Sequence, residues 1–131
     1  ILVVEDNDIN AEIILDMLKD AGIKCLRAKD GAAALEVIPK VDFDLVLMDC
    51  QMPVMDGFSA TRAIRDLPGD KSGIPIIALT ANAFDEDRKA CLSAGMNDYL
   101  SKPVRRTSLF TMLIKYVGYQ AVTDETPGPT D

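Results

Sequence analysis

Short apolar runs alternate along the chain with longer stretches in which apolar residues recur every three or four positions. The short runs have the length and the β-branched content of strands buried on both faces, and the longer stretches have the period of amphipathic helices. The pattern predicts five strands, over residues 1–4, 23–28, 45–48, 75–79 and 98–101. It also predicts five helices, which begin after Asn7 or Asp8, after Asp30, after Gly57, near Phe84 and at Val104.

Strict alternation of strand and helix indicates a parallel sheet with helices on both faces. For five strands in a chain of this length, the strand order 2-1-3-4-5 fits. We therefore predict an α/β, flavodoxin-like doubly wound five-stranded parallel sheet with five helices over residues 1–117. From Gly118 onward the chain is rich in Thr, Pro, Gly and acids and has no apolar period, so residues 118–131 are predicted to form a disordered linker or tail.

The composition excludes several classes of protein. The 131 residues suffice for one domain, and the net charge of −7 disfavours a nucleic-acid-binding surface. Because the chain has no histidine, Ser-His-Asp and Cys-His catalytic sites and histidine-ligated metals are excluded. The three cysteines form no C-x-x-C pair and are expected to be reduced thiols. No membrane span or signal peptide is expected, and the start on a strand without Met suggests a segment of a longer protein.

Acidic residues follow two of the predicted strands. Glu5 and Asp6 follow the first strand, and Asp49 follows the third. In the order 2-1-3-4-5 these strands are neighbours, and the functional crevice lies at their carboxyl ends. Three adjacent carboxylates would repel one another and raise a pKa, and a hard divalent cation would relieve the repulsion. Carboxylates with water suit Mg²⁺, so these residues predict a Mg²⁺ site.

Two further polar residues are expected at the same edge of the sheet. Thr80 follows the fourth predicted strand, and Lys102 follows the fifth. A lysine can pair with a carboxylate or a phosphoryl oxygen, and a threonine hydroxyl can donate a hydrogen bond. Either residue alone is more often structural than functional. Together with a cation they would counter the charge that builds up when a phosphoryl group is transferred to Asp49.

Five blocks of sequence, in order, resemble the signature of the response-regulator receiver domain. They are ILVVEDN from residue 1, DLVLMD from residue 44, MP at 52 with DG at 56, ALTA from residue 78, and KP at 102. The resemblance covers about residues 1–117. Two longer segments, MDCQMPVMDG from residue 48 and LTANA from residue 79, are similar to those of receivers fused to hybrid sensor histidine kinases.

The resemblance implies a role for each residue of the acidic site. Asp49 matches the phosphorylated aspartate, which also binds the metal. Asp6 matches the acid that binds Mg²⁺ directly, and Glu5 matches the neighbour that often acts through water. The backbone carbonyl of Gln51 would be a further metal ligand. The Lys102-Pro103 bond matches a cis peptide in the family, but the sequence leaves its isomer open.

The resemblance also implies a switch. Thr80 matches the hydroxyl that bonds the phosphoryl group, Lys102 the lysine that pairs with it, and Tyr99 the aromatic residue that changes rotamer. Half-buried packing at the sheet edge would equally explain Tyr99. Gln51 and Asn82 flank the phosphoryl group in the family, and neither is a carboxylate that could orient a hydrolytic water. Slow to moderate self-dephosphorylation is therefore expected.

The implied reaction is phosphotransfer to Asp49 from the phosphohistidine of a histidine kinase or a histidine phosphotransfer domain. Since the chain has no histidine, the donor must lie on another domain or protein. We expect a cytoplasmic domain, monomeric or weakly dimeric, with no nucleic-acid or membrane contact of its own. It would catalyse only its own phosphotransfer and dephosphorylation. We expect it to belong to a hybrid sensor histidine kinase, and a stand-alone response regulator is the alternative.

Three rival functions are less consistent with the residues. An aspartyl-phosphate hydrolase of the haloacid-dehalogenase type would need a D-x-D-x-[TV] motif after its first strand, and that motif is missing. A degenerate receiver used only for docking would have lost an acid, the threonine or the lysine, and all are present. Nucleotide binding is disfavoured because the chain lacks G-x-x-x-x-G-K-[ST] and G-x-G-x-x-G.

Overall fold

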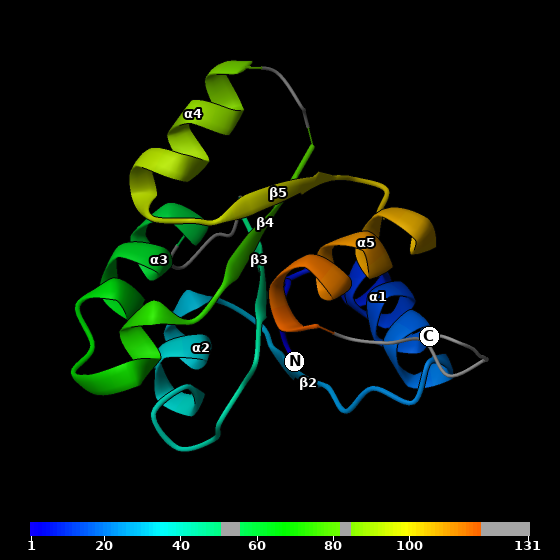
Figure 1. Cartoon of the computed structure of the whole chain (residues 1–131), viewed down its shortest axis with the longest axis horizontal. Coiled ribbons are helices and arrows are strands. Elements are labelled where there is room, and N and C mark those ends of the chain that lie inside the picture. Colours follow the sequence, from blue (N-terminus) through cyan, green and yellow to red (C-terminus); the bar gives the residue numbers. More distant parts are fainter. Residues whose placement is uncertain (51–55, 82–84, 119–131) are drawn as a thin grey trace.

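The computed structural model describes residues 1–50, 56–81 and 85–118. Within these ranges five strands form one central sheet, with helices on both of its faces (Figure 1). All neighbouring strands are parallel, in the order β2-β1-β3-β4-β5. The strands are β1 (Leu2–Val4), β2 (Leu26–Ala28), β3 (Val46–Asp49), β4 (Ile76–Thr80) and β5 (Asp98–Ser101). The predicted fold class and strand order are confirmed.

Five α-helices and one short 3-10 helix lie in the described part of the chain. They are α1 (Asp8–Asp20), α2 (Gly31–Val37), α3 (Gly57–Arg65), η1 (Gly69–Gly73), α4 (Asp85–Ala94) and α5 (Arg106–Val117). Helices α1 and α5 cover one face of the sheet, and α2, α3 and α4 cover the other (Figure 1). None of the described helices has both the length and the apolar character that a membrane crossing requires.

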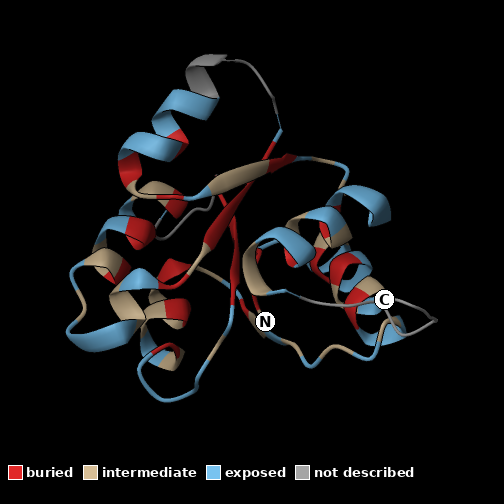
Figure 2. Cartoon of the chain, viewed as in Figure 1, coloured by how far each residue is buried: buried red, intermediate tan, exposed pale blue. Residues whose placement is uncertain are grey.

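Two apolar cores lie on either side of the sheet. Val3 belongs to the core under α1 and α5, whereas Leu2 and Val4 belong to the core under α2, α3 and α4. This alternation follows from the pleat, in which successive side chains point to opposite faces. Buried residues accordingly run along the strands and the inner sides of the helices (Figure 2). The continuous apolar runs of the sequence are explained by burial on both faces.

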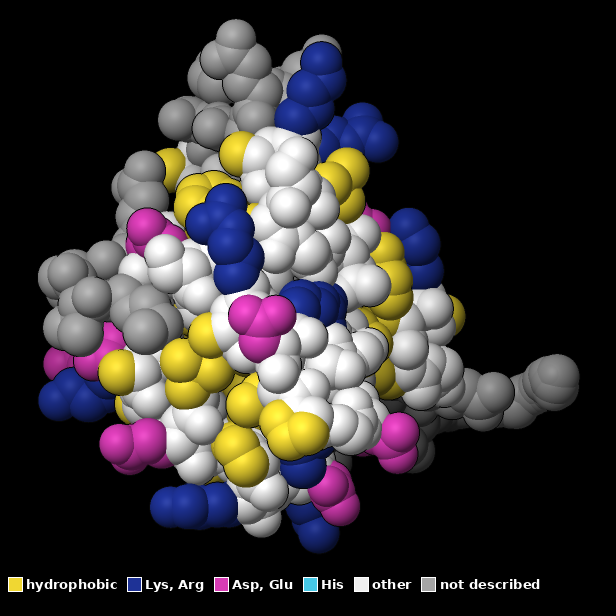
Figure 3. All heavy atoms as spheres, turned by 90° about the vertical axis from the view of Figure 1, so that its left-hand side faces the viewer, with side chains coloured by type: hydrophobic (Ala, Val, Ile, Leu, Met, Phe, Trp, Pro, Cys, Tyr) yellow, Lys and Arg dark blue, Asp and Glu magenta, His cyan; other side chains and the backbone are white. Residues whose placement is uncertain are grey.

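The outer surface of α2, α3 and α4 is chemically mixed. Figure 3 shows this side of the molecule, with basic and acidic side chains spread between hydrophobic groups. The charges visible on this side are therefore interspersed and not gathered by sign.

Asparagine and aspartate side chains set the starts of three helices. The side chain of Asn7 accepts a hydrogen bond from the amide of Asn10, and it is Asn7, not Asp8, that caps α1. Asp30 and Asp56 cap α2 and α3 in the same way. Such caps satisfy amides that have no partner within the helix. Since Asn7 lies close behind β1, its cap also fixes how soon the chain turns after the strand.

The structure departs by more than one residue from the predicted starts of two elements, the second strand and the last helix. The second strand begins at Leu26 and not at residue 23, because the amide of Ile23 bonds the carbonyl of Leu18 and completes the end of α1. The last helix begins at Arg106 and not at Val104, because Arg105 is still extended. The Lys102-Pro103 peptide bond, left open by the sequence, is cis. Residues 119–131 of the predicted tail lie outside the described residues.

Candidate functional site

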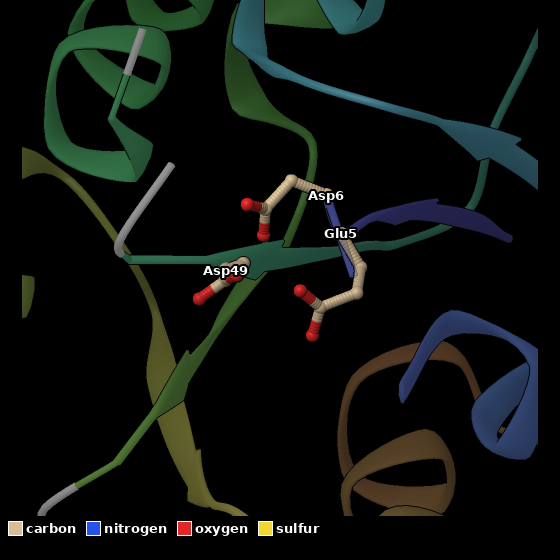
Figure 4. A group of neighbouring side chains, drawn as sticks. All are labelled: Glu5, Asp6 and Asp49. Atoms are coloured by element: carbon tan, nitrogen blue, oxygen red, sulfur yellow. The ribbon is translucent and has the colours of Figure 1, made fainter. Parts of the chain in front are cut away.

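The carboxyl ends of β1 and β3 bring three acids together. Val4 pairs with Met48 in the parallel ladder, so Glu5 and Asp6 leave β1 beside Asp49, the last residue of β3. One carboxylate oxygen from each acid lies within 4.8 Å of the others. Figure 4 shows the three side chains gathered at this edge of the sheet. The grouping expected from the sequence is present.

The three acids differ in their exposure to solvent. Glu5 is fully buried, at 0% exposed, and Asp49 is 3% exposed, whereas Asp6 is exposed. The site is therefore closed on the side of Glu5 and open on the side of Asp6.

Lys102 provides positive charge at the buried side of the site. Its Nζ lies 3.0 Å from Oδ1 of Asp49 and 3.1 Å from Oε1 of Glu5. Burial by itself would lower the pKa of Lys102, but the two carboxylates raise the pKa above its ordinary value. The lysine is therefore fully charged at neutral pH, as the sequence-based role requires.

The pKa of Glu5 is raised in spite of this lysine. Burial, followed by the hydrogen bond with Asp49, raises the pKa of Glu5 to about 7, and Lys102 only partly opposes the rise. Oε1 of Glu5 is buried and accepts no well-aligned hydrogen bond, although the Lys102 ammonium lies 3.1 Å away. Oε2 accepts a long bond of 3.3 Å from the amide of Asn7.

The residues present fit a bound Mg²⁺ ion. Three carboxylates lie together but Lys102 pairs with only two of them, Glu5 and Asp49. One buried oxygen of Glu5 lacks a hydrogen bond, and Asp6 is open to solvent. Hard cations such as Mg²⁺ prefer oxygen ligands and keep several waters, so an open site with acidic oxygens suits them. Gln51, the expected source of a backbone ligand, lies outside the described residues.

Thr80 and Tyr99 also lie where the sequence predicts. Thr80 is the last residue of β4, is buried, and stands at the same sheet edge as Asp49. Its carbonyl accepts a 2.8 Å hydrogen bond from the amide of Lys102. Tyr99, in β5, is half-buried and packs against the core under α2, α3 and α4. This is the packing at the sheet edge that the sequence left as an alternative. Asn82 lies outside the described residues.

Gly57 positions Asp49 in a way that the sequence analysis did not identify. Its amide donates to the carbonyl of Cys50 at 3.1 Å, and a Cβ at this position would overlap the carbonyl oxygen of Asp49. The first turn of α3 therefore rests directly on the end of β3. The only signal in the sequence is the Asp56-Gly57 pair that begins the helix.

Two other residues, Cys50 and Arg27, lie beside the site. Cys50 packs into the core beside Cys91, with 3.8 Å between the two sulfurs, and so has a structural place beside the site. Arg27 was not identified from the sequence, yet its guanidinium donates to the backbone carbonyls of Glu5 and Asp6. The signal in the sequence was weak, because the predicted second strand, residues 23–28, holds two cations, Lys24 and Arg27.

The model of the response regulator receiver domain matches residues 1–114. The chain belongs to the response regulator receiver domain family. The receiver domain is 46% identical over 125 residues to hybrid signal transduction histidine kinase B of Dictyostelium discoideum. That alignment covers 88% of this chain and 6% of the kinase, so the chain spans a small fraction of this relative's length.

Two solved structures resemble the receiver domain closely. One is the receiver domain of the sensor histidine kinase PA1611 from Pseudomonas aeruginosa PAO1, with a magnesium ion coordinated in its active-site cleft. It is 46% identical, with a TM-score of 0.82 and coverage of 90% of this chain and 96% of that one. The other is the Saccharomyces cerevisiae Ssk1 receiver domain, crystallised with the histidine phosphotransfer protein Ypd1. It is 33% identical, with a TM-score of 0.83 and coverage of 94% and 91%.

Proposed function

We propose that this receiver domain accepts a phosphoryl group from a partner phosphohistidine onto Asp49, in a Mg²⁺-dependent reaction. The observation that best supports this role is the position of the Asp49 carboxylate. It lies among the oxygens of Glu5 and Asp6 on one side and 3.0 Å from the Lys102 ammonium on the other. A carboxylate set between a site for a cation and a fixed lysine is suited to attack phosphorus and then to hold the transferred group.

The metal ligands would be Asp6 and Asp49 directly, Glu5 through water, and the backbone carbonyl of Gln51. Bound Mg²⁺ would supply positive charge that neutralises the phosphoryl oxygens. This role is supported by the excess of acid in the site and by the magnesium ion in the Pseudomonas receiver domain.

In the transfer step, a carboxylate oxygen of Asp49 forms a bond to phosphorus as the bond from phosphorus to the donor imidazole nitrogen breaks. The electron pair of the broken bond stays on the imidazole, which leaves as the neutral ring after it takes up a proton. Lys102 would pair with a phosphoryl oxygen during the step, and Thr80 would donate its hydroxyl to another. Fixed donors of this kind stabilise charge as it develops.

Phosphorylation would then shift the domain between two packed states. The Thr80 hydroxyl would move toward the phosphoryl group, and Tyr99 would turn inward from its half-buried position. Movement of these two residues would reshape the surface formed by α4, β5 and α5. Such a switch is a population shift that is driven by new contacts in one of the two states.

The domain would act as one step of a phosphorelay. The donor or acceptor would be a histidine kinase or a histidine phosphotransfer domain, as the Ssk1 complex with Ypd1 supports. The parent protein would be a hybrid sensor histidine kinase, with the domain in the cytoplasm as a monomer or weak dimer. A stand-alone response regulator is the alternative. An aspartyl-phosphate hydrolase is disfavoured, because its motif is missing and the receiver family matches residues 1–114.

Labelling with a small phosphodonor tests this proposal. The domain is incubated with acetyl phosphate and Mg²⁺, and the product is analysed by intact-mass spectrometry. We expect one phosphoryl group, which hydroxylamine removes and which requires Mg²⁺. Asp49→Asn should abolish the adduct, whereas Asp42→Asn, an exposed acid outside the site, should leave it unchanged. An adduct that persists in Asp49→Asn would disprove the assignment.

A further inference from the structure

Arg27 ties the loop after β1 to the edge of the sheet. It lies in the middle of β2, opposite Val3 in the ladder. Its Nε and Nη2 both donate to the carbonyl oxygen of Glu5, at 3.1 and 2.9 Å, and Nη2 also donates to the carbonyl oxygen of Asp6 at 3.2 Å. Its Nη1 forms a salt bridge with Oδ1 of Asp8 at 2.7 Å. One planar group thus holds the chain from the end of β1 to the first residue of α1.

These contacts fix the direction of the Asp6 side chain. The carbonyl of Glu5 belongs to the peptide plane before the Cα of Asp6, and the carbonyl of Asp6 belongs to the plane after it. Because a peptide unit is planar, holding both carbonyls restricts the two backbone dihedrals between them. Those dihedrals set the direction of the Asp6 Cα–Cβ bond, from which the carboxylate extends toward the site. Arg27 therefore acts on the acid through its backbone.

The loop has few other contacts that could do this. The ladder between β1 and β2 ends where the amide of Glu5 donates to the carbonyl of Ala28 at 3.1 Å. Asp6 is exposed, so the packing that would orient a buried side chain is weak around it. The guanidinium of Arg27 supplies the donors that a further strand residue would otherwise have supplied. The hydrogen bonds from the Arg27 guanidinium thus take the place of further backbone pairing between β1 and β2.

We infer that Arg27 is a positioning residue for the metal site, and that it preorganises Asp6 to receive Mg²⁺. The inference rests on the proposed function, because it concerns the same metal. Arg27 contacts the two backbone carbonyls and not the three carboxylates of the site, and its own carboxylate partner, Asp8, lies outside that group. Its donor geometry, and not its charge, is therefore what acts. A lysine would keep the charge but lose the planar fork that serves several acceptors.

Two variants and a matched control test the inference. The variants are Arg27→Gln and Arg27→Lys. The control is Lys71→Gln, since Lys71 donates to a backbone carbonyl and to an aspartate, those of Val41 and Asp42, both at 3.0 Å. This contact precedes β3 and β4 and so lies at the opposite edge of the sheet from the acids. The control measures what the loss of a loop-binding cation does to stability alone.

Two measurements use the unphosphorylated domain. Backbone ¹H–¹⁵N spectra during titration with Mg²⁺ alone give its dissociation constant. Hydrogen exchange in metal-free buffer reports the order of the loop through the amides of Asn7 and Asn10, whose acceptors are side chains of the same loop. Thermal unfolding of each variant confirms that it is folded.

We expect Arg27→Gln and Arg27→Lys each to weaken Mg²⁺ binding by about tenfold, as loss of a supporting contact does in other metal sites. Both should speed exchange at Asn7 and Asn10 without metal. Lys71→Gln should change neither quantity. Unchanged binding and exchange in Arg27→Gln, or full recovery in Arg27→Lys, would overturn the inference. If the unsubstituted domain bound no Mg²⁺, the proposed function and the metal part of this inference would both fail, and the exchange rates would still decide whether Arg27 orders the loop.

Discussion

The ammonium of Lys102 lies 3.0 Å from Oδ1 of Asp49, although β4 lies between β3, which ends at Asp49, and β5, which Lys102 follows. The lysine side chain therefore reaches across the end of β4, where Thr80 stands. The three residues expected to hold a phosphoryl group thus come from three neighbouring strands. Their relative placement depends on the sheet and not on any single loop.

Lys102→Met should slow phosphorylation by a small phosphodonor by about a hundredfold at saturating Mg²⁺, the usual cost of losing one charge-stabilising donor. The methionine keeps the apolar length of the side chain but removes the ammonium from Asp49 and Glu5. The rate is measured by intact-mass spectrometry over time. Lys71→Met, a change in a lysine outside the site, is the control. Equal rates in the two variants would show that the lysine has no part in the transfer.

Glu5 should make the stability of the metal-free domain depend on pH. Its pKa is about 7 when folded, raised from 4.5, so between these values the folded state holds a proton that the unfolded chain has released. Stability due to this group is therefore fully present below pH 4.5 and is lost as pH rises toward 7. For one proton, the slope is at most about 1.4 kcal/mol per pH unit.

Urea unfolding in the presence of a chelator, from pH 4.5 to 8, measures this effect. Glu5→Gln cannot release the proton, so the stability difference between it and the unsubstituted domain isolates the group. The glutamine variant should gain relative stability as pH rises through the window. A difference that stays constant with pH would contradict the raised pKa.

Gly57→Ala should destabilise the domain by roughly 1–3 kcal/mol, the range found when a methyl group is forced into a packed region. The added Cβ would overlap the carbonyl oxygen of Asp49, which is backbone and cannot turn aside. Phosphorylation should slow as well, because Asp49 must shift. Gly73→Ala is the matched control, since a Cβ there meets no atom within 4 Å. Urea unfolding of both variants measures the two changes in stability. An equal loss of stability in both would contradict the proposed clash with Asp49.

Thiol labelling should distinguish the three cysteines. Cys25 is partly exposed, whereas Cys50 and Cys91 are buried. Burial, the largest cause, raises the pKa of Cys50, so little of the reactive thiolate forms. One equivalent of a thiol reagent should therefore react quickly with the native domain, and two more only in denaturant. Cys25→Ser should eliminate the fast phase, and fast labelling of Cys50 would show that the end of β3 opens readily.

Asn82→Glu should speed the loss of the phosphoryl group from Asp49. The amides at Gln51 and Asn82 provide no carboxylate to orient an attacking water, and a glutamate at position 82 would supply one. The decay of the phosphorylated domain is followed by mass spectrometry after removal of the donor. Asn82→Gln, which keeps an amide, serves as the control. A glutamate variant that decays at the unchanged rate would refute this account of slow self-dephosphorylation.

Much of this site could be predicted because it depends on strand ends. Glu5, Asp49 and Thr80 each stand at or just after a run of apolar residues, and the strand order alone brings such ends to one edge. The starts of α1 and α2 were equally accessible, because Asn7 and Asp30 carry their own capping groups, whereas α5 has no side-chain cap and begins later than predicted. Local chemistry and topology agree at these positions.

The remaining features of the site could not be predicted, because they depend on contacts between segments that lie far apart in the sequence. The reach of Arg27 to the loop after β1 follows from the register of β1 and β2, which apolar patterning does not specify at single-residue accuracy. The contact of Gly57 with Asp49 depends on how closely α3 approaches β3. On α1, both Ile9 and Ile14 are apolar, and the sequence does not show that Ile14 is buried while Ile9 stays 70% exposed.

The burial of Asp49 also limits the shape of any donor. At 3% exposed, the carboxylate is recessed below the surface of the domain. A phosphohistidine set flush in a flat protein surface could not bring its phosphorus within bonding distance of the oxygen. For the proposed transfer, the donor would carry its imidazole on a convex surface, such as the ridge of a helix, that enters the recess. As the proposed acceptor, Asp49 would thus select its partners by their contour before any chemical step begins.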